Sequence, residues 1–251
     1  MRAKLLCIAT TTAAFFAIAA NAAVVDITGI TGKWTATTGT SVDDLNSDSI
    51  RWGDPATSAG KSGYDFDAAS TPINNVAADT SFDLGLFTHL NRPIYPPSIT
   101  SATLQVLINL SIDGLAQTPI LSTFIFNHWE TDNEPRRGNC ANDEDNWQGV
   151  NKNGCADRVQ AVLNLSSTDS FTIGLDEYVF TIEGFKVGPD TFDEFWTKEE
   201  KSNSATLRAF YTLKTNVEPP PPPSEVPLPA AGLLLFGAVS GLGMFARRRR
   251  N

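Results

Sequence analysis

The sequence predicts an all-β protein: an antiparallel β-sandwich, jelly-roll or immunoglobulin-like, with one short helix and a C-terminal membrane helix. The first observation is a run from residue 102 to 112 in which apolar and polar residues alternate with a period of two, as in a half-buried strand. The second is that the alternation recurs over residues 177–183 and 205–214. The third is that no long helical pattern separates these segments, which favours two packed sheets. Further strands are expected at about residues 32–38, 48–53, 80–91, 118–129, 157–165 and 169–173.

The short helix is predicted for residues 191–200. Thr191 and Glu194 have the spacing of a capping box, in which two side chains satisfy free backbone N–H groups at the start of a helix. Three aromatic residues of the segment would then share one helical face: Phe192, Phe195 and Trp196.

Residues 1–22 have the three parts of a secretory signal peptide. Arg2 and Lys4 give a positive start, an apolar run follows, and Ala20-Asn21-Ala22 provides a small-residue cleavage site. We therefore expect export through the inner membrane by the secretion machinery, and removal of the leader by signal peptidase after residue 22, or after residue 23. An uncleaved N-terminal anchor is the alternative.

The C-terminal segment has the pattern of a membrane-inserted tail. The linker at residues 218–225 contains five consecutive prolines, which favour an extended spacer. The apolar run of residues 230–246 would form about 25 Å of helix at 1.5 Å per residue, close to the thickness of a bilayer core. By the positive-inside rule, the four arginines that follow keep this end in the cytoplasm: Arg247, Arg248, Arg249 and Arg250. Residues 23–217 are then expected to form a β-sandwich domain on the opposite side of the membrane.

The body of the chain is acidic. The formal net charge is −9, but six of the 19 basic residues lie in the two terminal segments. Without those six, 13 basic residues remain against 28 acidic ones, a net charge of −15. Such a surface repels phosphate backbones, so we expect no nucleic-acid partner.

Residues 226–251 resemble the PEP-CTERM sorting tail in its VPLPA form. The resemblance rests on the apolar helix, the arginine cluster and the motif that precedes them: Val226, Pro227, Leu228, Pro229 and Ala230. It implies recognition by exosortase, an inner-membrane protease of Gram-negative, exopolysaccharide-producing bacteria. The helix would then be a transient inner-membrane anchor, lost before the protein reaches the cell surface, outer envelope or extracellular matrix. A plain C-terminal membrane anchor is the alternative.

The domain itself resembles the THxN family of PEP-CTERM proteins. The resemblance rests on Thr88, His89 and Asn91, together with the block that contains His128 and Glu130. Further blocks are Ile50-Arg51-Trp52-Gly53-Asp54-Pro55, Ser62-Gly63-Tyr64-Asp65-Phe66 and Cys155-Ala156-Asp157-Arg158-Val159. The family is defined by its sequence and its export signals, and it implies no known activity.

Cys140 and Cys155 are the cysteines that remain once Cys7 leaves with the signal peptide. In an oxidising envelope compartment, two cysteines predict one disulfide. It would close a polar loop of about 15 residues and contribute roughly 3 kcal/mol in the chain-entropy model. A metal-binding pair is the rival interpretation, although no Cys-x-x-Cys spacing supports it.

The two histidines raise the question of a metal site. His89 and Asn91 would share one face of a strand, as would His128 and Glu130. If the two strands are neighbours, two imidazoles and a carboxylate could bind zinc with an open position, as a hydrolase requires. The alternatives are a buried hydrogen-bonded network and a ligand contact.

The acidic run around Asp143 and Asp145 could supply oxygen ligands for Ca²⁺, although it lacks the EF-hand pattern. A solvated acidic loop is the simpler interpretation, and no other cofactor is expected. The five tryptophans would stack on sugars if exposed in a row, whereas core packing is their commoner role: Trp34, Trp52, Trp129, Trp147 and Trp196.

Together these observations predict an exported cell-envelope or matrix protein, with a structural or adhesive role near exopolysaccharide or in biofilm, and not an enzyme. The first alternative is a surface module that binds carbohydrate or calcium. The second is a metal-dependent hydrolase that uses His89, His128 and Glu130.

Overall fold

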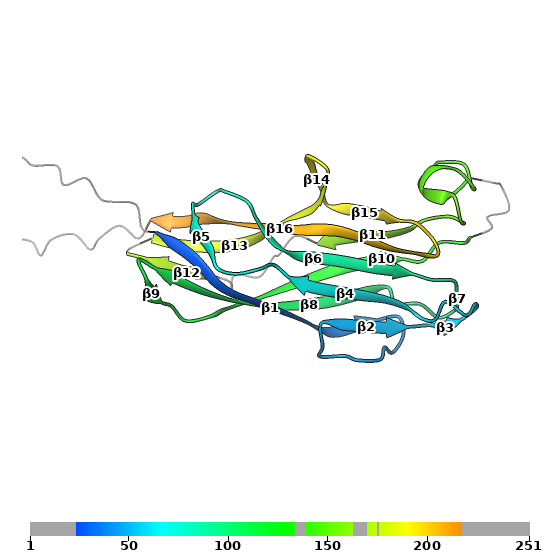
Figure 1. Ribbon diagram of the computed structural model, residues 1–251, viewed down its shortest axis with the longest axis horizontal. Coiled ribbons are helices and arrows are strands. Elements are labelled where there is room, and N and C mark those ends of the chain that lie inside the picture. The colour runs from blue at the N-terminus through cyan, green and yellow to red at the C-terminus, as the bar shows by residue number, and fades with distance from the viewer. Residues whose placement is uncertain (1–23, 134–138, 163–169, 175, 217–251) are drawn as a thin grey trace, which may run out of the picture. The chain divides into compact units, whose positions relative to one another are not determined.

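The computed structural model describes residues 24–133, 139–162, 170–174 and 176–216. These residues form two antiparallel sheets that face each other, with a further short pair of strands (Figure 1). The all-β prediction and the antiparallel pairing are therefore confirmed for this part of the chain.

The first sheet has the strand order β15-β11-β10-β8-β1-β5, and β9 pairs with β8. Its long central pairs are β1 with β8 and β8 with β10. The bounds of its strands are Val25–Thr38 for β1, Ile73–Val76 for β5, Ser101–Ile112 for β8, Leu115–Ala116 for β9, Ile120–Trp129 for β10, Asp157–Val162 for β11 and Glu194–Thr197 for β15.

The second sheet has the order β12-β13-β16-β6-β4-β2, and β14 pairs with β13. Its strands are β2 (Ser49–Trp52), β4 (Ser62–Ala68), β6 (Phe82–Asn91), β12 (Ser170–Ile173), β13 (Asp176–Val187), β14 (Asp190–Phe192) and β16 (Lys201–Asn216). The short extra pair is β3 (Asp54–Pro55) with β7 (Ile94–Tyr95), and a 3-10 turn, η1, covers Gly149–Asn151.

The nine predicted strand segments all coincide with strands. The clearest is β8, in which burial alternates along the strand as the period of two requires. Residues 32–38 are the end of the longer β1, and residues 163–165 of the predicted 157–165 strand lie outside the described residues. β4, β5, β15 and four strands of two or three residues were not predicted, because short segments carry too few alternations to be recognised.

The predicted helix at residues 191–200 is wrong, because this segment forms β14, β15 and a turn. β15 adds its backbone to the edge of β11, which a helix could not do. Phe195 packs towards Phe185 in the core, whereas Trp196 lies beside Trp129 on the outer side. The aromatic residues therefore follow the period of a strand instead of sharing one helical face.

The core is strongly aromatic. Trp34 of the first sheet contacts Tyr64 and Phe87 of the second, with ring centroids 5.3 and 6.1 Å apart. Phe126 of β10 also stacks on Phe87 at 5.4 Å. These rings pack between the sheets from both sides, and at one end of the sandwich they give way to histidines and carboxylates.

The signal peptide at 1–22, the linker at 218–225 and the sorting tail at 226–251 lie outside the described residues, as does the predicted membrane helix. Within the described part of the chain, no helix is long and apolar enough to cross a bilayer.

Gly85 of β6 leaves room for Phe66, whose ring carbons would lie 2.6 Å from a Cβ at this position. The backbone oxygen of Asp67 lies 2.7 Å from the same point, so neither neighbour can move away freely. We expect Gly85→Ala to lower the free energy of unfolding by about 1–3 kcal/mol through overpacking, measured by urea denaturation. The control is Gly29→Ala, whose methyl group would meet the movable amide of Asn109. Equal effects of the two substitutions would contradict the packing argument.

Candidate functional site

Five titratable side chains meet inside the sandwich, near one end of the two sheets. We call them the histidine–carboxylate cluster: His89, His128, Glu130, Asp157 and Glu199. Their potential ligand atoms form two groups that share Asp157, and within each group all of these atoms lie within 4.8 Å of one another. One group contains both histidines, and the other contains both glutamates.

Each member comes from a strand or a strand end. His89 belongs to β6 of the second sheet, whereas His128 of β10 and Asp157 of β11 belong to the first sheet. Glu130 directly follows β10, and Glu199 lies in the turn between β15 and β16. The cluster therefore joins the two sheets across the interior.

Thr197 holds the ring of His89 from one side. Its hydroxyl oxygen lies 2.8 Å from His89 Nδ1 and 3.1 Å from the backbone oxygen of Asp157. In the tautomer in which this hydroxyl donates to Asp157, the His89 proton is on Nδ1 and Nε2 carries a lone pair. That Nε2 is buried and has no hydrogen-bond partner. Burial lowers the pKa of His89 well below its usual value, which keeps the ring neutral.

His128 is held on both sides. Its Nδ1 lies 2.7 Å from the hydroxyl oxygen of Tyr64, and its Nε2 lies 3.3 Å from Glu130 Oε2. The same carboxylate oxygen accepts a hydrogen bond from Ser98 Oγ at 2.9 Å. The ring of Trp52 stacks on His89 and meets His128 edge-on, so an aromatic wall surrounds both imidazoles.

The two buried carboxylates lack counter-charges. Asp157 accepts a 2.8 Å hydrogen bond from the backbone N–H of Thr131 through Oδ1, whereas Oδ2 has no partner. Both carboxylate oxygens of Glu199 are also buried without a hydrogen bond of good geometry, although the side chains of Asn91 and Asn133 lie near enough to oppose the rise of its pKa. Burial, together with the charges of Glu130 and Glu199, raises the pKa of Asp157 well above its usual range. Burial and the charge of Glu130 raise the pKa of Glu199 to about 7.

Unpartnered polar atoms are concentrated at this site. Among the described residues, ten buried side-chain atoms have no hydrogen-bond partner, and six of them belong to the cluster or to two neighbouring asparagines, Asn91 and Asn133. Three of the other four belong to side chains in ion pairs. An unsatisfied buried polar group costs about 1–3 kcal/mol, so such a concentration identifies the cluster as a candidate binding site.

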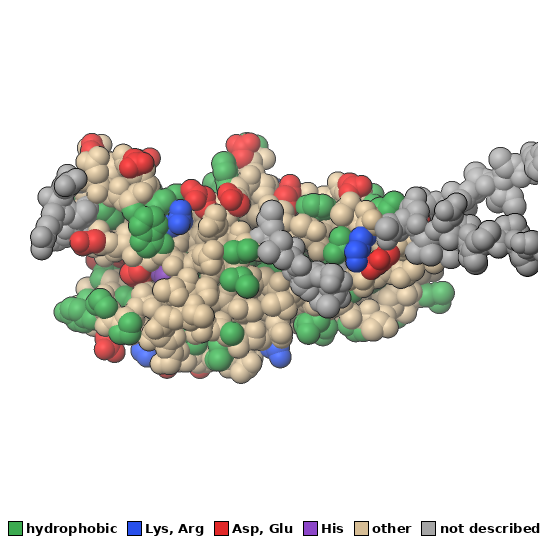
Figure 2. Space-filling model, turned by 180° about the vertical axis from the view of Figure 1, so that it is seen from behind, with side chains coloured by type: hydrophobic (Ala, Val, Ile, Leu, Met, Phe, Trp, Pro, Cys, Tyr) green, Lys and Arg blue, Asp and Glu red, His purple; other side chains and the backbone are tan. Residues whose placement is uncertain are grey.

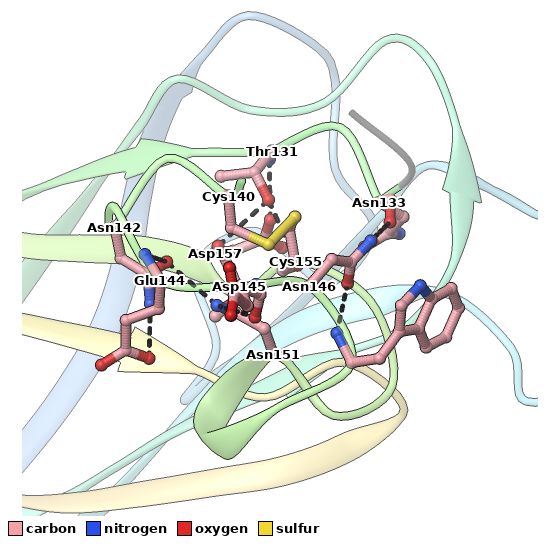
Figure 3. Close-up of a disulfide and its surroundings, with 12 residues drawn as sticks. Thr131, Asn133, Cys140, Asn142, Glu144, Asp145, Asn146, Asn151, Cys155 and Asp157 are labelled. Atoms are coloured by element: carbon pink, nitrogen blue, oxygen red, sulfur yellow. Dashed lines mark hydrogen bonds between the residues drawn. A yellow bond between two sulfur atoms is a disulfide. The ribbon is translucent and has the colours of Figure 1, made fainter. Parts of the chain in front are cut away.

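The disulfide predicted between Cys140 and Cys155 is present, with the two Cα atoms 5.3 Å apart. Figure 3 shows it above a loop joined by side-chain amides: Asn151 donates to Asn142, and Asn146 donates to the backbone oxygen of Asn133. The hydroxyl of Thr131 donates to the backbone oxygens of residues 155 and 156. The loop therefore fixes the segment that leads into Asp157.

Other predicted site residues lie elsewhere. Thr88 faces away from the cluster and lies 2.8 Å from Ser204 Oγ, on the neighbouring strand β16. The possible calcium ligands Asp143 and Asp145 lie in the exposed disulfide loop, and Gln148 donates to Asp145 at 3.4 Å. Neither belongs to the groups that could hold a metal among the described residues.

A second feature lies on the outer face of the first sheet. Trp129, Arg158 and Trp196 are cross-strand neighbours on β10, β11 and β15; we call them the tryptophan–arginine strip. The two indoles lie 6.5 Å apart, and the Arg158 guanidinium lies 5.0 Å from the Trp129 ring. Trp129 is 46% exposed. Figure 2 shows hydrophobic side chains gathered beside a basic one towards one end of the molecule.

Four of the residues that meet here were predicted together from the sequence: His89, Asn91, His128 and Glu130. Asp157 and Glu199 were not predicted as site residues. Asp157 was visible within a block of the family resemblance, whereas Glu199 was assigned to the helix that does not form. No protein-family model matches the chain, and no curated protein matches its sequence.

Glu199→Gln tests the electrostatics of the site in the presence of EDTA. Glu199 has a pKa of about 7 when folded and an ordinary value of 4.5, so the folded state holds a proton that the unfolded chain has released between these values. The contribution of Glu199 to the free energy of unfolding is therefore fully present below about pH 4.5 and is lost as the pH rises through 7. We expect Glu199→Gln to raise the free energy of unfolding by roughly 1–3 kcal/mol at pH 8 and by much less at pH 4.5.

The measurement is chemical denaturation at the two pH values, with Glu194→Gln as the control. The Glu194 side chain is 39% exposed and pairs with Arg158 at 3.7 Å, so its loss should leave the pH dependence unchanged. A Glu199→Gln protein that is equally destabilised at both pH values would contradict the charge argument.

Proposed function

We propose that this chain is an exported cell-envelope or extracellular-matrix protein, sorted by exosortase, with a structural or adhesive role near exopolysaccharide or in biofilm. It would be a passive surface protein and not an enzyme. The jelly-roll or immunoglobulin-like topology and the C-terminal membrane helix are parts of the same proposal.

The observation that carries this proposal is the Cys140–Cys155 disulfide. Disulfides persist in oxidising compartments and are rare in the cytosol. The bond uses both cysteines outside the leader, and it holds the loop that precedes Asp157. Together with a leader sequence and a resemblance to a sorting tail, it supports a domain that matures outside the cytoplasm.

The burial of the cluster supports a non-enzymatic role. A metal-dependent hydrolase must bring water and substrate to its metal. His89, Asp157 and Glu199 expose none of their surface, so a substrate would have to open the sandwich to reach them.

Intact-mass measurement of the protein released from the cell surface tests the sorting proposal. The expected mature chain begins at residue 23 and lacks the segment after about Pro229, because signal peptidase and exosortase each remove one terminal segment. Replacement of Arg247 to Arg250 by Ala should leave the tail uncleaved and change cell retention. Recovery of the full tail from the surface of wild-type cells would contradict the proposal.

The tryptophan–arginine strip supports a second candidate, a carbohydrate-binding module. Exposed indoles stack on the apolar faces of sugar rings, and the adjacent row of Asn127, Gln160 and Glu194 offers amides and a carboxylate in cross-strand register. Arg158 would favour acidic sugars. Trp147 is also exposed, at 60%, but it belongs to the disulfide loop and not to these strands.

Binding of the purified protein to acidic and neutral polysaccharides by affinity electrophoresis tests this candidate. We expect Trp129→Ala and Trp196→Ala each to weaken binding about tenfold, because each removes half of the aromatic platform. Trp147→Ala is the matched control and should retain binding. Binding that depends on Trp147 and not on the strip, or no binding to any glycan tested, would reject this candidate.

A further inference from the structure

We propose that the histidine–carboxylate cluster binds a divalent first-row transition-metal ion of the zinc class, through His89 Nε2, His128 Nε2 and the carboxylate of Asp157. The ion would join the two sheets from inside. This inference is independent of how the chain is exported and sorted.

His89 Nε2 and Asp157 Oδ2 are both buried, and neither has a hydrogen-bond partner. The two residues belong to one group whose potential ligand atoms all lie within 4.8 Å of one another. Polar atoms left unpaired in a dry interior cost free energy. A metal ion accepts a lone pair from each ligand and removes that cost.

Each proposed ligand side chain is oriented by a hydrogen-bond contact at another of its atoms. Metal-binding histidines usually use the second ring nitrogen for a hydrogen bond that fixes their orientation. His89 has Thr197 in this role, and His128 has Tyr64 at 2.7 Å. Asp157 is fixed in the same way, because its Oδ1 accepts the backbone N–H of Thr131 and leaves Oδ2 free. His128 Nε2 also lies 3.3 Å from Glu130 Oε2, a contact that coordination of the ion would replace.

The carboxyl groups of the cluster have no basic side chain to balance them. Glu130 and Glu199 lie beside Asp157, so the interior holds three carboxyl groups. In the described part of the chain, no ion pair joins any of them to a lysine or arginine. Arg158, the basic neighbour of Asp157 in sequence, lies on the outer face against Trp129. A divalent ion would supply the missing positive charge.

The ligand types select the class of ion. Imidazole nitrogens suit zinc and other first-row transition metals, whereas Ca²⁺ and Mg²⁺ take oxygen ligands. The second group, with Glu130 and Glu199 around Asp157, would offer oxygens alone. We assign the histidine side because it contains a buried imidazole nitrogen, His89 Nε2, that has no hydrogen-bond partner.

The role of the ion would be structural. Because His89 comes from the second sheet and His128 and Asp157 come from the first, coordination would tie β6 to β10 and β11. His128 and Asp157 also precede Trp129 and Arg158, so the same bond would fix the strand ends beneath the tryptophan–arginine strip.

The test is titration of chelator-treated, full-length protein with Zn²⁺ and, separately, with Ca²⁺, followed by calorimetry and thermal denaturation. We expect one equivalent of Zn²⁺ to bind and to raise Tm by roughly 5–10 °C at a hundredfold excess over Kd. Co²⁺ in place of Zn²⁺ should give visible absorption bands of nitrogen and oxygen coordination. His89→Gln and Asp157→Asn should each lose at least tenfold in affinity, whereas Asp143→Asn with Asp145→Asn should retain wild-type affinity.

A measurement on the wild-type protein keeps the proposal testable if these variants do not fold. In protein labelled with ¹⁵N-histidine, Zn²⁺ should shift both Nε2 signals, since the chain has two histidines. The proposal is overturned if Zn²⁺ does not bind, if both Nε2 signals stay unchanged, or if affinity is lost in the Asp143 and Asp145 variant alone. Binding of Ca²⁺ with no binding of Zn²⁺ would also overturn it, in favour of the oxygen-only group.

Discussion

The alternation of side chains along β10, β11 and β15 is the constraint on which both features of this end of the molecule depend. Successive residues of a strand point to opposite faces, so His128, Asp157 and Thr197 turn inward while Trp129, Arg158 and Trp196 turn outward. A one-residue shift in register would bury the tryptophans and the arginine and expose the cluster. The polar interior and the aromatic surface are therefore two sides of one arrangement.

The aromatic core of the sandwich offsets the cost of a polar interior at this end. The aromatic residues that fill the space between the sheets continue up to the cluster, where Tyr64 and Trp52 contact the imidazoles directly. Their packing excludes water, which strengthens each hydrogen bond nearby and also makes each unpaired oxygen costly. The energy for this comes from the large apolar area buried by the rest of the core.

The disulfide loop and the cluster are connected through Thr131 and Asp157. Closing a loop of this length restricts the unfolded chain, and in this protein it also positions a buried carboxylate. The polar loop has little apolar surface to pack, so the disulfide and the side-chain amide hydrogen bonds hold it in place.

The sequence alone determined the strand class, most of the long strands and the disulfide, because period-two patterns and cysteine counts are local properties. It also predicted His89, Asn91, His128 and Glu130 as candidate site residues, since His89 and Asn91, like His128 and Glu130, lie two residues apart. It failed at residues 191–200, where a capping pattern competed with pairing to the edge of β11, and such pairing cannot be read from a local segment. Only the tertiary structure decided that Asp157 and Glu199 join the histidines and that Thr88 does not. The two groups join residues up to 69 positions apart (Glu130 and Glu199), and they depend on how two sheets pack and on which face each strand turns inward.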